Sequence, residues 1–248
     1  MGATKFEYRF RWFLHAVIFT LGFWAPWCAP LGWTQLRTWL VLSSWLSRTG
    51  WLTFIAATNA MLIAAIVLVA LGAWLRVWGA SYVGASVVNA PGMHGEAMLA
   101  DGPYRRTRNP LYLGTILHTL GLAILMSPSG AVFCVACVWL LQVRLALAEE
   151  PFLTARFGDP YVEYRKGVPR FLPAPTPQVP AAGKKPQWVQ GFFGEIYFVG
   201  VLITYVVFGW NFNSMLIIRG VLISLGAWII VKAFLPKPKE VGAVSEVS

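Results

Sequence analysis

Long apolar runs recur along this chain, and they restrict it to one broad class of fold. A helix needs about 20 apolar residues to cross the hydrocarbon layer of a bilayer. Several runs reach that length, and polar loops separate them. We therefore predict an all-α fold, a polytopic transmembrane helical bundle of about six spans with interfacial helices on the cytoplasmic side. The expected spans are residues 12–29, 51–78, 110–127, 130–148, 191–210 and 215–235.

Two segments of this layout carry further structural expectations. Residues 31–49 are rich in tryptophan but too polar for a span, which indicates an interfacial helix. The run 51–78 is longer than a bilayer requires, so it should tilt or protrude and carry Arg76 beyond the bilayer. The first run has no small-residue cleavage site, so we expect it to remain in the mature protein.

Composition supports a membrane protein. Charged residues make up 12% of the chain, against about 25% in ordinary soluble domains, and the mean hydropathy is +0.61. The 13 tryptophans suit the interfaces of a bilayer. A net charge of +10 fits cationic loops in contact with anionic lipid, so we expect the bilayer as a partner and no nucleic acid.

Lysine and arginine are distributed unevenly between the loops. They concentrate before residue 12, in the loop 79–109, in the region 149–190 and in the tail, whereas the tips at 127–129 and 211–213 carry none. Because cytoplasmic loops are enriched in these cations, both termini are predicted to be cytoplasmic in a multi-pass protein of a bacterial inner membrane. Only Arg37 and Arg48 fall on the far side. The two long polar regions then face one compartment and can build one site.

The same boundaries divide the chain into four parts. Residues 1–49 hold the first span and the interfacial helix, and residues 50–173 form the core. A linker rich in proline and alanine covers residues 174–190, and residues 191–248 form a helical hairpin and a tail. The cysteines at 28, 134 and 137 lie in or beside apolar runs, so we interpret them as small buried hydrophobes, with a redox pair of the last two as the alternative. We expect no metal site.

The first candidate site element is the stretch 102–114, where a cationic loop enters an apolar run. Asn109-Pro110 is typical of a helix start, with asparagine as the cap and proline as the first helical residue. The free N–H groups of a helix N-terminus suit a carboxylate or a phosphate. Arg105 and Arg108 have two open interpretations, as anchors that follow the positive-inside rule or as ligands of an anion.

The second element is Glu149-Glu150, which we expect at the C-terminal end of the fourth span. Carboxylates there oppose the helix dipole, and paired acids at a membrane edge usually have a cationic partner. Such a local conflict indicates a functional site. The structural alternative is that both acids simply pair with nearby arginines.

The third element covers residues 157–171. Leu153, Phe157, Tyr161 and Tyr164 recur at helical spacing, after an Asp159-Pro160 helix start. An aromatic stripe of this kind is either an interfacial anchor or the roof of a site for a cationic ligand.

Together and in this order, the elements resemble the integral-membrane methyltransferase family that includes isoprenylcysteine carboxyl methyltransferase and the phospholipid N-methyltransferases. The resemblance covers residues 50–173. The matching segments are Gly102-Pro103-Tyr104-Arg105, Arg108-Asn109-Pro110-Leu111-Tyr112-Leu113-Gly114, Glu149-Glu150-Pro151-Phe152-Leu153, Phe157-Gly158-Asp159-Pro160-Tyr161-Val162-Glu163-Tyr164 and Val168-Pro169-Arg170-Phe171-Leu172-Pro173.

The resemblance implies an S-adenosylmethionine-dependent methyltransferase that acts on an amphiphilic or lipid-like acceptor, a carboxylate or an amine, at the cytoplasmic face. Asparagine stands at position 109, where the family has histidine, and asparagine cannot titrate, so it does not serve as a base. The resemblance assigns catalytic roles to Arg105, Arg108, Asn109 and Glu150. It assigns cofactor binding to Tyr104, Asn109, Pro110, Tyr112, Leu113, Gly114, Glu149, Glu150, Tyr161, Tyr164, Arg170 and Phe171.

Two other functions are open to a chain of this kind. A membrane reductase of the sterol type would use NADPH, and the arginines suit its 2′-phosphate, but Glu149-Glu150 would repel it. A transporter or structural membrane protein would carry polar residues in mid-span and an internal repeat. The chain has His118 in the third run but no repeat, and we interpret this histidine as a satisfied core residue. The oligomeric state does not follow from the sequence.

Overall fold

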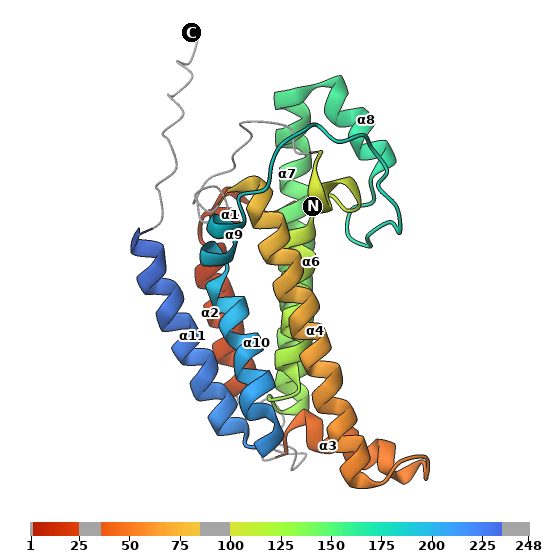
Figure 1. The fold of residues 1–248 in the computed structure, drawn as a ribbon, viewed down its shortest axis with the longest axis vertical. Coiled ribbons are helices and arrows are strands. Elements are labelled where there is room, and N and C mark those ends of the chain that lie inside the picture. Colours follow the sequence, from red (N-terminus) through yellow and green to blue (C-terminus); the bar gives the residue numbers. More distant parts are fainter. Residues whose placement is uncertain (1, 25–35, 85–99, 235–248) are drawn as a thin grey trace.

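A computed structural model describes residues 2–24, 36–84 and 100–234 (Figure 1). These residues form helices joined by turns and extended segments, and no strand occurs among them, so the prediction of an all-α fold is confirmed. The elements are α1 (Lys5–Arg9), α2 (Arg11–Trp24), α3 (Thr38–Arg48), α4 (Phe54–Val83), η2 (Gly102–Arg105), α6 (Pro110–Ala123), α7 (Pro128–Phe157), α8 (Asp159–Gly167), α9 (Trp188–Gly194), α10 (Ile196–Phe208), η3 (Gly209–Asn211) and α11 (Ser214–Phe234).

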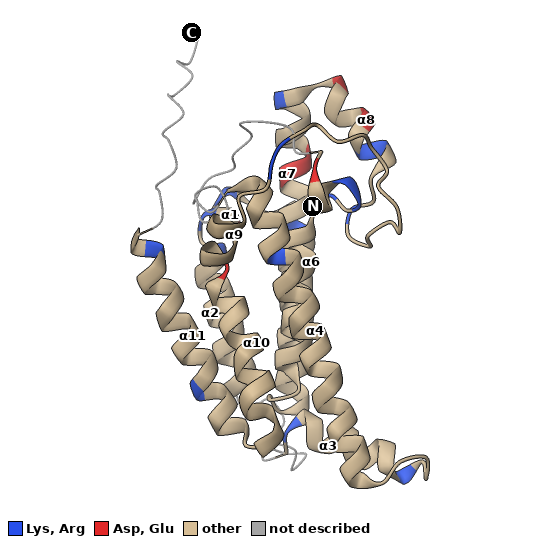
Figure 2. Cartoon of the chain, in the orientation of Figure 1, with Lys and Arg blue, Asp and Glu red and all other residues tan. Residues whose placement is uncertain are grey.

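The long helices lie side by side along one axis and form an elongated bundle (Figure 1). α3 lies at one end of this bundle, and α1, α8 and α9 lie toward the other end. Charged residues gather at the α8 end, whereas long stretches of the bundle carry none (Figure 2). Uncharged helices suit an apolar bilayer, so the charged end is where a polar site can form.

The apolar helices occupy the predicted positions, but their lengths support fewer spans than six. α4, α7 and α11 are long and apolar enough to cross a membrane, among the residues described. α9 and α10 form a fourth span only if they are taken together, because they meet at a bend of 70°. α6 has 14 residues and ends in a turn, rather than continuing to residue 127 as expected. Ser127 instead caps α7, which begins at Pro128.

Two helix boundaries correct the sequence analysis. α4 continues to Val83, past the predicted end at residue 78, and Arg76 within it is buried in the bundle. The position of Arg76 beyond the bilayer stays a prediction. α7 continues to Phe157 through Pro151, so Glu149 and Glu150 lie inside a helix and not at its C-terminal end. In both cases, side chains from other elements bind the charged groups, which the sequence does not show. Arg76 pairs with Glu195 and Glu150 pairs with arginines, whereas Glu149 accepts hydrogen bonds from neutral tyrosine hydroxyls.

Glycines bring α4 and α6 into close contact. The pair packs through Gly72 and Gly114, where a Cβ on either residue would lie within 2.8 Å of the carbonyl oxygen of the other. A Cβ on Gly121 would meet Val69 in the same way. The glycine of the motif at position 114 therefore has a packing role, because small residues let helix backbones approach closely in membranes.

Replacing Gly72 with alanine should lower the stability of the protein by about 1–3 kcal/mol, the usual cost of overpacking. The added methyl group would lie 2.7 Å from the carbonyl oxygen of Gly114 and 3.0 Å from the backbone nitrogen of His118. Gly226→Ala in α11 is the matched control, because nothing lies within 4 Å of its Cβ position. Thermal unfolding followed by circular dichroism tests this, and equal midpoints for the two variants would contradict it.

The described cysteines agree with the sequence analysis. Cys134 is buried and Cys137 is partly buried, and both are free thiols. Cys134 packs with Met126 and Val138 in an apolar cluster, as a small hydrophobe would. The cysteine at position 28 lies outside the described residues.

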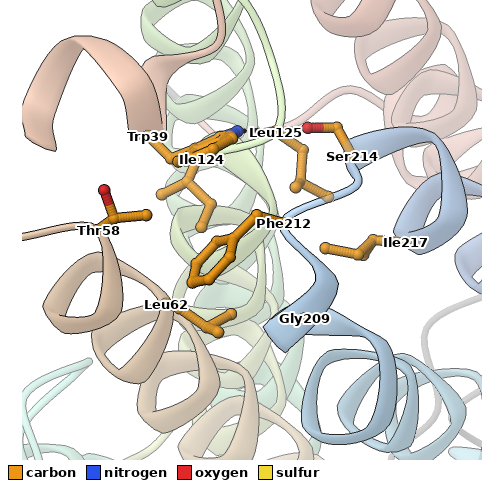
Figure 3. A pocket seen from close by; sticks show the side chains of 9 residues that line it. All are labelled: Trp39, Thr58, Leu62, Ile124, Leu125, Gly209, Phe212, Ser214 and Ile217. Carbon is orange, nitrogen blue, oxygen red and sulfur yellow. Dashed lines mark hydrogen bonds between the residues drawn. The ribbon is translucent and has the colours of Figure 1, made fainter. Parts of the chain in front are cut away.

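A small pocket lies beside α3, at the end of the bundle away from α8 (Figure 1 and Figure 3). Its lining contains no ionisable side chain, and Trp39 and Phe212 stack beside it with ring centroids 5.8 Å apart. The lining residues are Trp39, Thr58, Leu62, Ile124, Leu125, Gly209, Phe212, Ser214 and Ile217. This pocket contains none of the predicted site residues, so we do not place the candidate site there.

Candidate functional site

The loop before α6 is held in place by hydrogen bonds to residues 183–184, near the end of the polar region 149–190. The buried carboxylate of Asp101 accepts hydrogen bonds from the backbone N–H groups of Gly183 (3.2 Å) and Lys184 (2.9 Å). Gly102 follows with a φ of +56°, and a Cβ there would overlap the Tyr82 ring. Only glycine fits this position, so it lets η2 turn the chain toward Asn109.

The segment 168–179, which we call the covering segment, lies along this loop. The N–H of Arg108 donates to the carbonyl of Pro169 (2.9 Å), and that of Ala174 donates to the carbonyl of Arg106 (2.9 Å). Side chains of the loop add contacts, because Arg105 Nε donates to the Val179 carbonyl at 2.8 Å. These bonds unite motif segments about 65 residues apart in the chain, and they assign Arg105 to holding the covering segment.

Glu150 is the centre of the charged cluster. Its Oε1 accepts hydrogen bonds from Arg108 Nη1 and from Arg170 Nε, both at 2.7 Å, and its Oε2 accepts from Arg170 Nη2 at 2.9 Å. The Glu150 side chain is 10% exposed, and that of Arg170 is 40% exposed. The sequence analysis placed all three residues in the site, and the structure brings them together. The structural alternative, in which the acids simply pair with nearby arginines, also describes Glu150.

Glu149 occupies a different environment from its neighbour. Its Oε1 accepts hydrogen bonds from the phenol groups of Tyr112 (2.5 Å) and Tyr8 (2.6 Å). Burial and the nearby Glu149 charge raise the pKa of Tyr8, so its hydroxyl stays a donor. Tyr8 comes from α1, far from the motifs, and the sequence offered no signal for it.

Aromatic residues of α8 close the other side of the loop. Tyr161 and Tyr164 are buried, with ring centroids 5.9 Å apart. The Tyr164 hydroxyl donates to the carbonyl of Tyr104 at 2.8 Å, and burial raises the pKa of Tyr164. These rings therefore support the loop from inside, whereas the aromatic stripe was expected to lie either at an interface or over a ligand.

The remaining predicted residues divide between the loop and the bundle. Asn109 donates from Nδ2 to the Arg170 carbonyl at 3.0 Å, and Pro110 starts α6 as predicted. Phe171 lies with its ring centroid 6.1 Å from that of Trp139. Leu113 and Gly114 are buried on α6, and Gly114 faces α4.

The chemistry of this charged end fits S-adenosylmethionine. This compound carries a sulfonium cation and a carboxylate, which match the Glu149 carboxylate and the arginines held by Glu150. Arg108 Nε is buried and has no hydrogen-bond partner within the described part of the chain, so a donor is available beside Glu150. Glu150 thus holds two guanidinium groups at the start of α6, where free N–H groups favour an anion.

The N-terminal helix is fastened to this end of the bundle by a second ion pair. Glu7 accepts from Arg144 Nε at 2.9 Å and from Arg144 Nη2 at 2.8 Å, and it also caps α1 with Thr4. The hydrogen bonds from Arg144 lower the pKa of Glu7 from 4.5 to about 2. This contact places Tyr8, the next residue, against Glu149.

We expect the attachment of α1 to depend on pH. Because the folded pKa of Glu7 is lowered, its contribution to stability is complete above pH 4.5 and is lost as the pH falls toward 2. Hydrogen exchange should show the protection factor of the Ala3 amide, which donates to the Arg144 carbonyl at 2.8 Å, falling over that window. Glu7→Gln should remove this dependence, and an unchanged pH profile in that variant would contradict the assignment.

Sequence analysis missed one buried ion pair in the bundle. Arg76 Nε and Nη2 donate to the two carboxylate oxygens of Glu195 at 2.6 and 2.8 Å, and Arg76 Nη1 donates to Thr115 Oγ1 at 2.8 Å. Glu195 lies at the bend between α9 and α10. The sequence did carry a signal for this pair, because Glu195 is an acid at the edge of an otherwise apolar run, and such acids rarely occur without a cationic partner.

The fold and the site define a class, an all-helical membrane protein with a charged, tyrosine-rich site at one end of its bundle. Residues 60–160 match the sequence profile described as phospholipid methyltransferase. This match covers less than half of the chain, and over this central region the predicted resemblance to the phospholipid methyltransferase family is confirmed.

Curated relatives are similar over the same part of the chain. A protein-S-isoprenylcysteine O-methyltransferase of Schizosaccharomyces pombe is 32% identical over 77 residues, which are 31% of this chain and 33% of that protein. Protein-S-isoprenylcysteine O-methyltransferase A of Arabidopsis thaliana is 30% identical over 96 residues, 38% of this chain and 48% of that protein. The matches thus span less than half of these relatives. No solved structure matches the chain.

Proposed function

We propose that the protein is an S-adenosylmethionine-dependent methyltransferase that acts on an amphiphilic or lipid-like acceptor at the membrane edge. The observation that carries this proposal is the convergence of Arg108 and Arg170 on Glu150, beside the first turn of α6. These residues come from separate motif segments of the family. Their convergence gives the cofactor a compact set of charged and aromatic partners.

S-adenosylmethionine supplies a methyl group that is already activated as a sulfonium. The protein then has to align the two reactants and exclude water. Arg108 and Arg170 are placed to bind the carboxylate of the cofactor, and Glu150 keeps their guanidinium groups oriented. Glu149, whose orientation is fixed by Tyr8 and Tyr112, would attract the sulfonium cation of the cofactor. Asn109 holds the covering segment and moves no proton.

The acceptor is proposed to reach the site from the bilayer, because the charged end adjoins apolar helices (Figure 2). Its reacting group is a carboxylate, as in the isoprenylcysteine that the relatives' names specify, or an amine. A carboxylate needs no base, whereas an amine must arrive deprotonated. Our proposed orientation places the charged end and both termini in the cytoplasm of a bacterium, because cytoplasmic loops are rich in lysine and arginine.

Calorimetry on the purified protein tests the cofactor. We expect saturable binding of S-adenosylmethionine and of S-adenosylhomocysteine, and none of NADPH, because the Glu149 carboxylate, which accepts hydrogen bonds from the neutral phenols of Tyr8 and Tyr112, would repel a phosphorylated ligand. Binding of NADPH in place of S-adenosylmethionine would support the membrane reductase instead. Absence of binding by either compound would refute both enzymes and leave a transporter or structural protein.

A further inference from the structure

A layer of polar groups crosses the interior of the bundle below the charged site. Arg76 of α4 is the centre of this layer, through its bonds to Glu195 and Thr115. Its guanidinium carbon lies 4.3 Å from the ring centroid of Phe198 and 5.9 Å from that of Trp12. His118 packs against Phe198 with ring centroids 4.6 Å apart, so α2, α4, α6 and α10 all contribute.

His15 and Gln142 extend this layer to α7. His15 Nδ1 lies 2.6 Å from the carbonyl oxygen of Arg11, which can only accept, so Nδ1 carries a proton. Gln142 Nε2 donates to His15 Nε2 at 2.7 Å. Both ring nitrogens of His15 are therefore hydrogen-bonded. The Gln142 amide nitrogen makes one of these bonds, and its oxygen Oε1 is an acceptor without a donor among the described residues.

Three buried polar atoms of this layer have no hydrogen-bond partner among the described residues. They are Trp12 Nε1, Gln142 Oε1 and His118 Nδ1. Both His118 and Gln142 are 1% exposed. The interpretation of His118 as a satisfied histidine is thus only half right, since Nε2 lies 3.5 Å from the Tyr197 hydroxyl while Nδ1 is unpaired. Leaving such atoms unpaired costs about 1–3 kcal/mol each, so they indicate that a polar group of another molecule, here called the guest, binds in this layer.

The charge of the layer limits what this guest can be. Both oxygens of Glu195 pair with Arg76, and their side chains are 2% and 5% exposed, so the pair carries no net charge. A cation placed here would have no counter-charge, at a large cost in free energy. A carboxylate could face the buried guanidinium of Arg11, whose carbon lies 5.9 Å from the Trp12 ring, but it only accepts hydrogen bonds and would leave Gln142 Oε1 unpaired. The unpaired atoms include a donor on Trp12 and an acceptor on Gln142. A hydroxyl group is small and neutral, and it matches both of these atoms.

A lateral approach from the bilayer adjoins the layer. Within the described residues, α2 and α11 do not pack closely against each other. They meet through Trp12 and Trp228, whose ring centroids lie 5.8 Å apart. Apolar side chains of α11, including Leu225 and Ile229, are exposed on its surface. The chain of an amphiphile can lie along this surface. Rings at this distance are in contact, so its polar end reaches Trp12 when the two tryptophans move apart.

We propose that this layer is a second binding site, for the uncharged hydroxyl group of an amphiphile that enters from the bilayer between α2 and α11. The hydroxyl accepts from Trp12 Nε1 and donates to Gln142 Oε1. This site is separate from the charged cofactor site and does not depend on the proposed methyl transfer.

The test uses 4-octylphenol with the full chain in lipid nanodiscs, and 4-octylbenzoate and octylbenzene as probes of the same length. Ligand linkage predicts a rise of about 3–6 °C in the unfolding midpoint at tenfold excess over Kd, for the phenol alone. Trp12→Phe keeps the ring and removes the donor, and Gln142→Leu removes the acceptor. Both should lose the shift, whereas Trp139→Phe, an exposed tryptophan of α7, should keep it.

Equal shifts with octylbenzene would show simple partition and overturn the proposal, as would a full shift in Trp12→Phe. No shift with any probe would mean that the layer holds only water. If Gln142→Leu does not fold, the loss or retention of the midpoint shift in Trp12→Phe alone tests the proposal. Calorimetry with S-adenosylmethionine on the same preparation separates the two proposals, because either ligand can bind without the other.

Discussion

Replacing Glu150 with glutamine should lower labelled methyl transfer from S-adenosylmethionine into a lipid extract by about 100-fold or more, the effect typical of losing a preorganised charged contact. Glutamine keeps the size of the side chain but removes the charge that holds Arg108 and Arg170. The two guanidinium groups would then repel each other and lose their orientation. Calorimetry should show the same loss in cofactor binding, because the defect lies in the site itself.

Glu163→Gln is the matched control for this substitution. Glu163 is an acid on the neighbouring α8, and it pairs with Lys166 at 2.7 Å, but its side chain is 70% exposed. Its loss should leave transfer unchanged, since exposed ion pairs contribute little. Circular dichroism must show that Glu150→Gln is folded. Equal labelling by a folded Glu150→Gln variant and the wild type would remove Glu150 from the site.

Replacing Arg76 with methionine should destabilise the protein by about 3–5 kcal/mol, the cost of leaving a buried charge without its partner. Glu195 would lose both of its hydrogen bonds from Arg76 while it remains at the bend between α9 and α10. The double variant Arg76→Met/Glu195→Leu should recover most of this loss, because two apolar residues replace the pair. Unfolding midpoints of the single and double variants measure the coupling.

Arg48→Met controls for the loss of an arginine, because Arg48 is exposed at the end of α3. We expect it to change stability by less than about 0.5 kcal/mol. A double variant that is less stable than Arg76→Met alone would contradict the assignment of this pair. The pair would then contribute through packing of its long side chains rather than through charge.

The sequence determined the class of fold, because the lengths of the apolar runs restrict each segment to a helix regardless of its neighbours. It also identified the start of α6 at Pro110, since the preference of proline for the first helical position is local. The predicted capping by Asn109 was wrong, because its side chain makes no capping hydrogen bond and instead donates to the Arg170 carbonyl. The motif residues Glu150, Arg108 and Arg170 were assigned to one site through the resemblance to a family, which depends on the order of the motifs along the chain.

Only the tertiary structure decided which side chains bind the buried acids. Tyr8 meets Glu149 from a helix 141 residues away, and Arg76 meets Glu195 across 119 residues. No local pattern encodes such pairs, because they depend on how the helices pack. The same contacts explain why α7 continues past Glu149-Glu150 and why Arg76 is buried. The sequence thus supplied the helices and the chemistry, whereas packing of the helices determined where each charge lies.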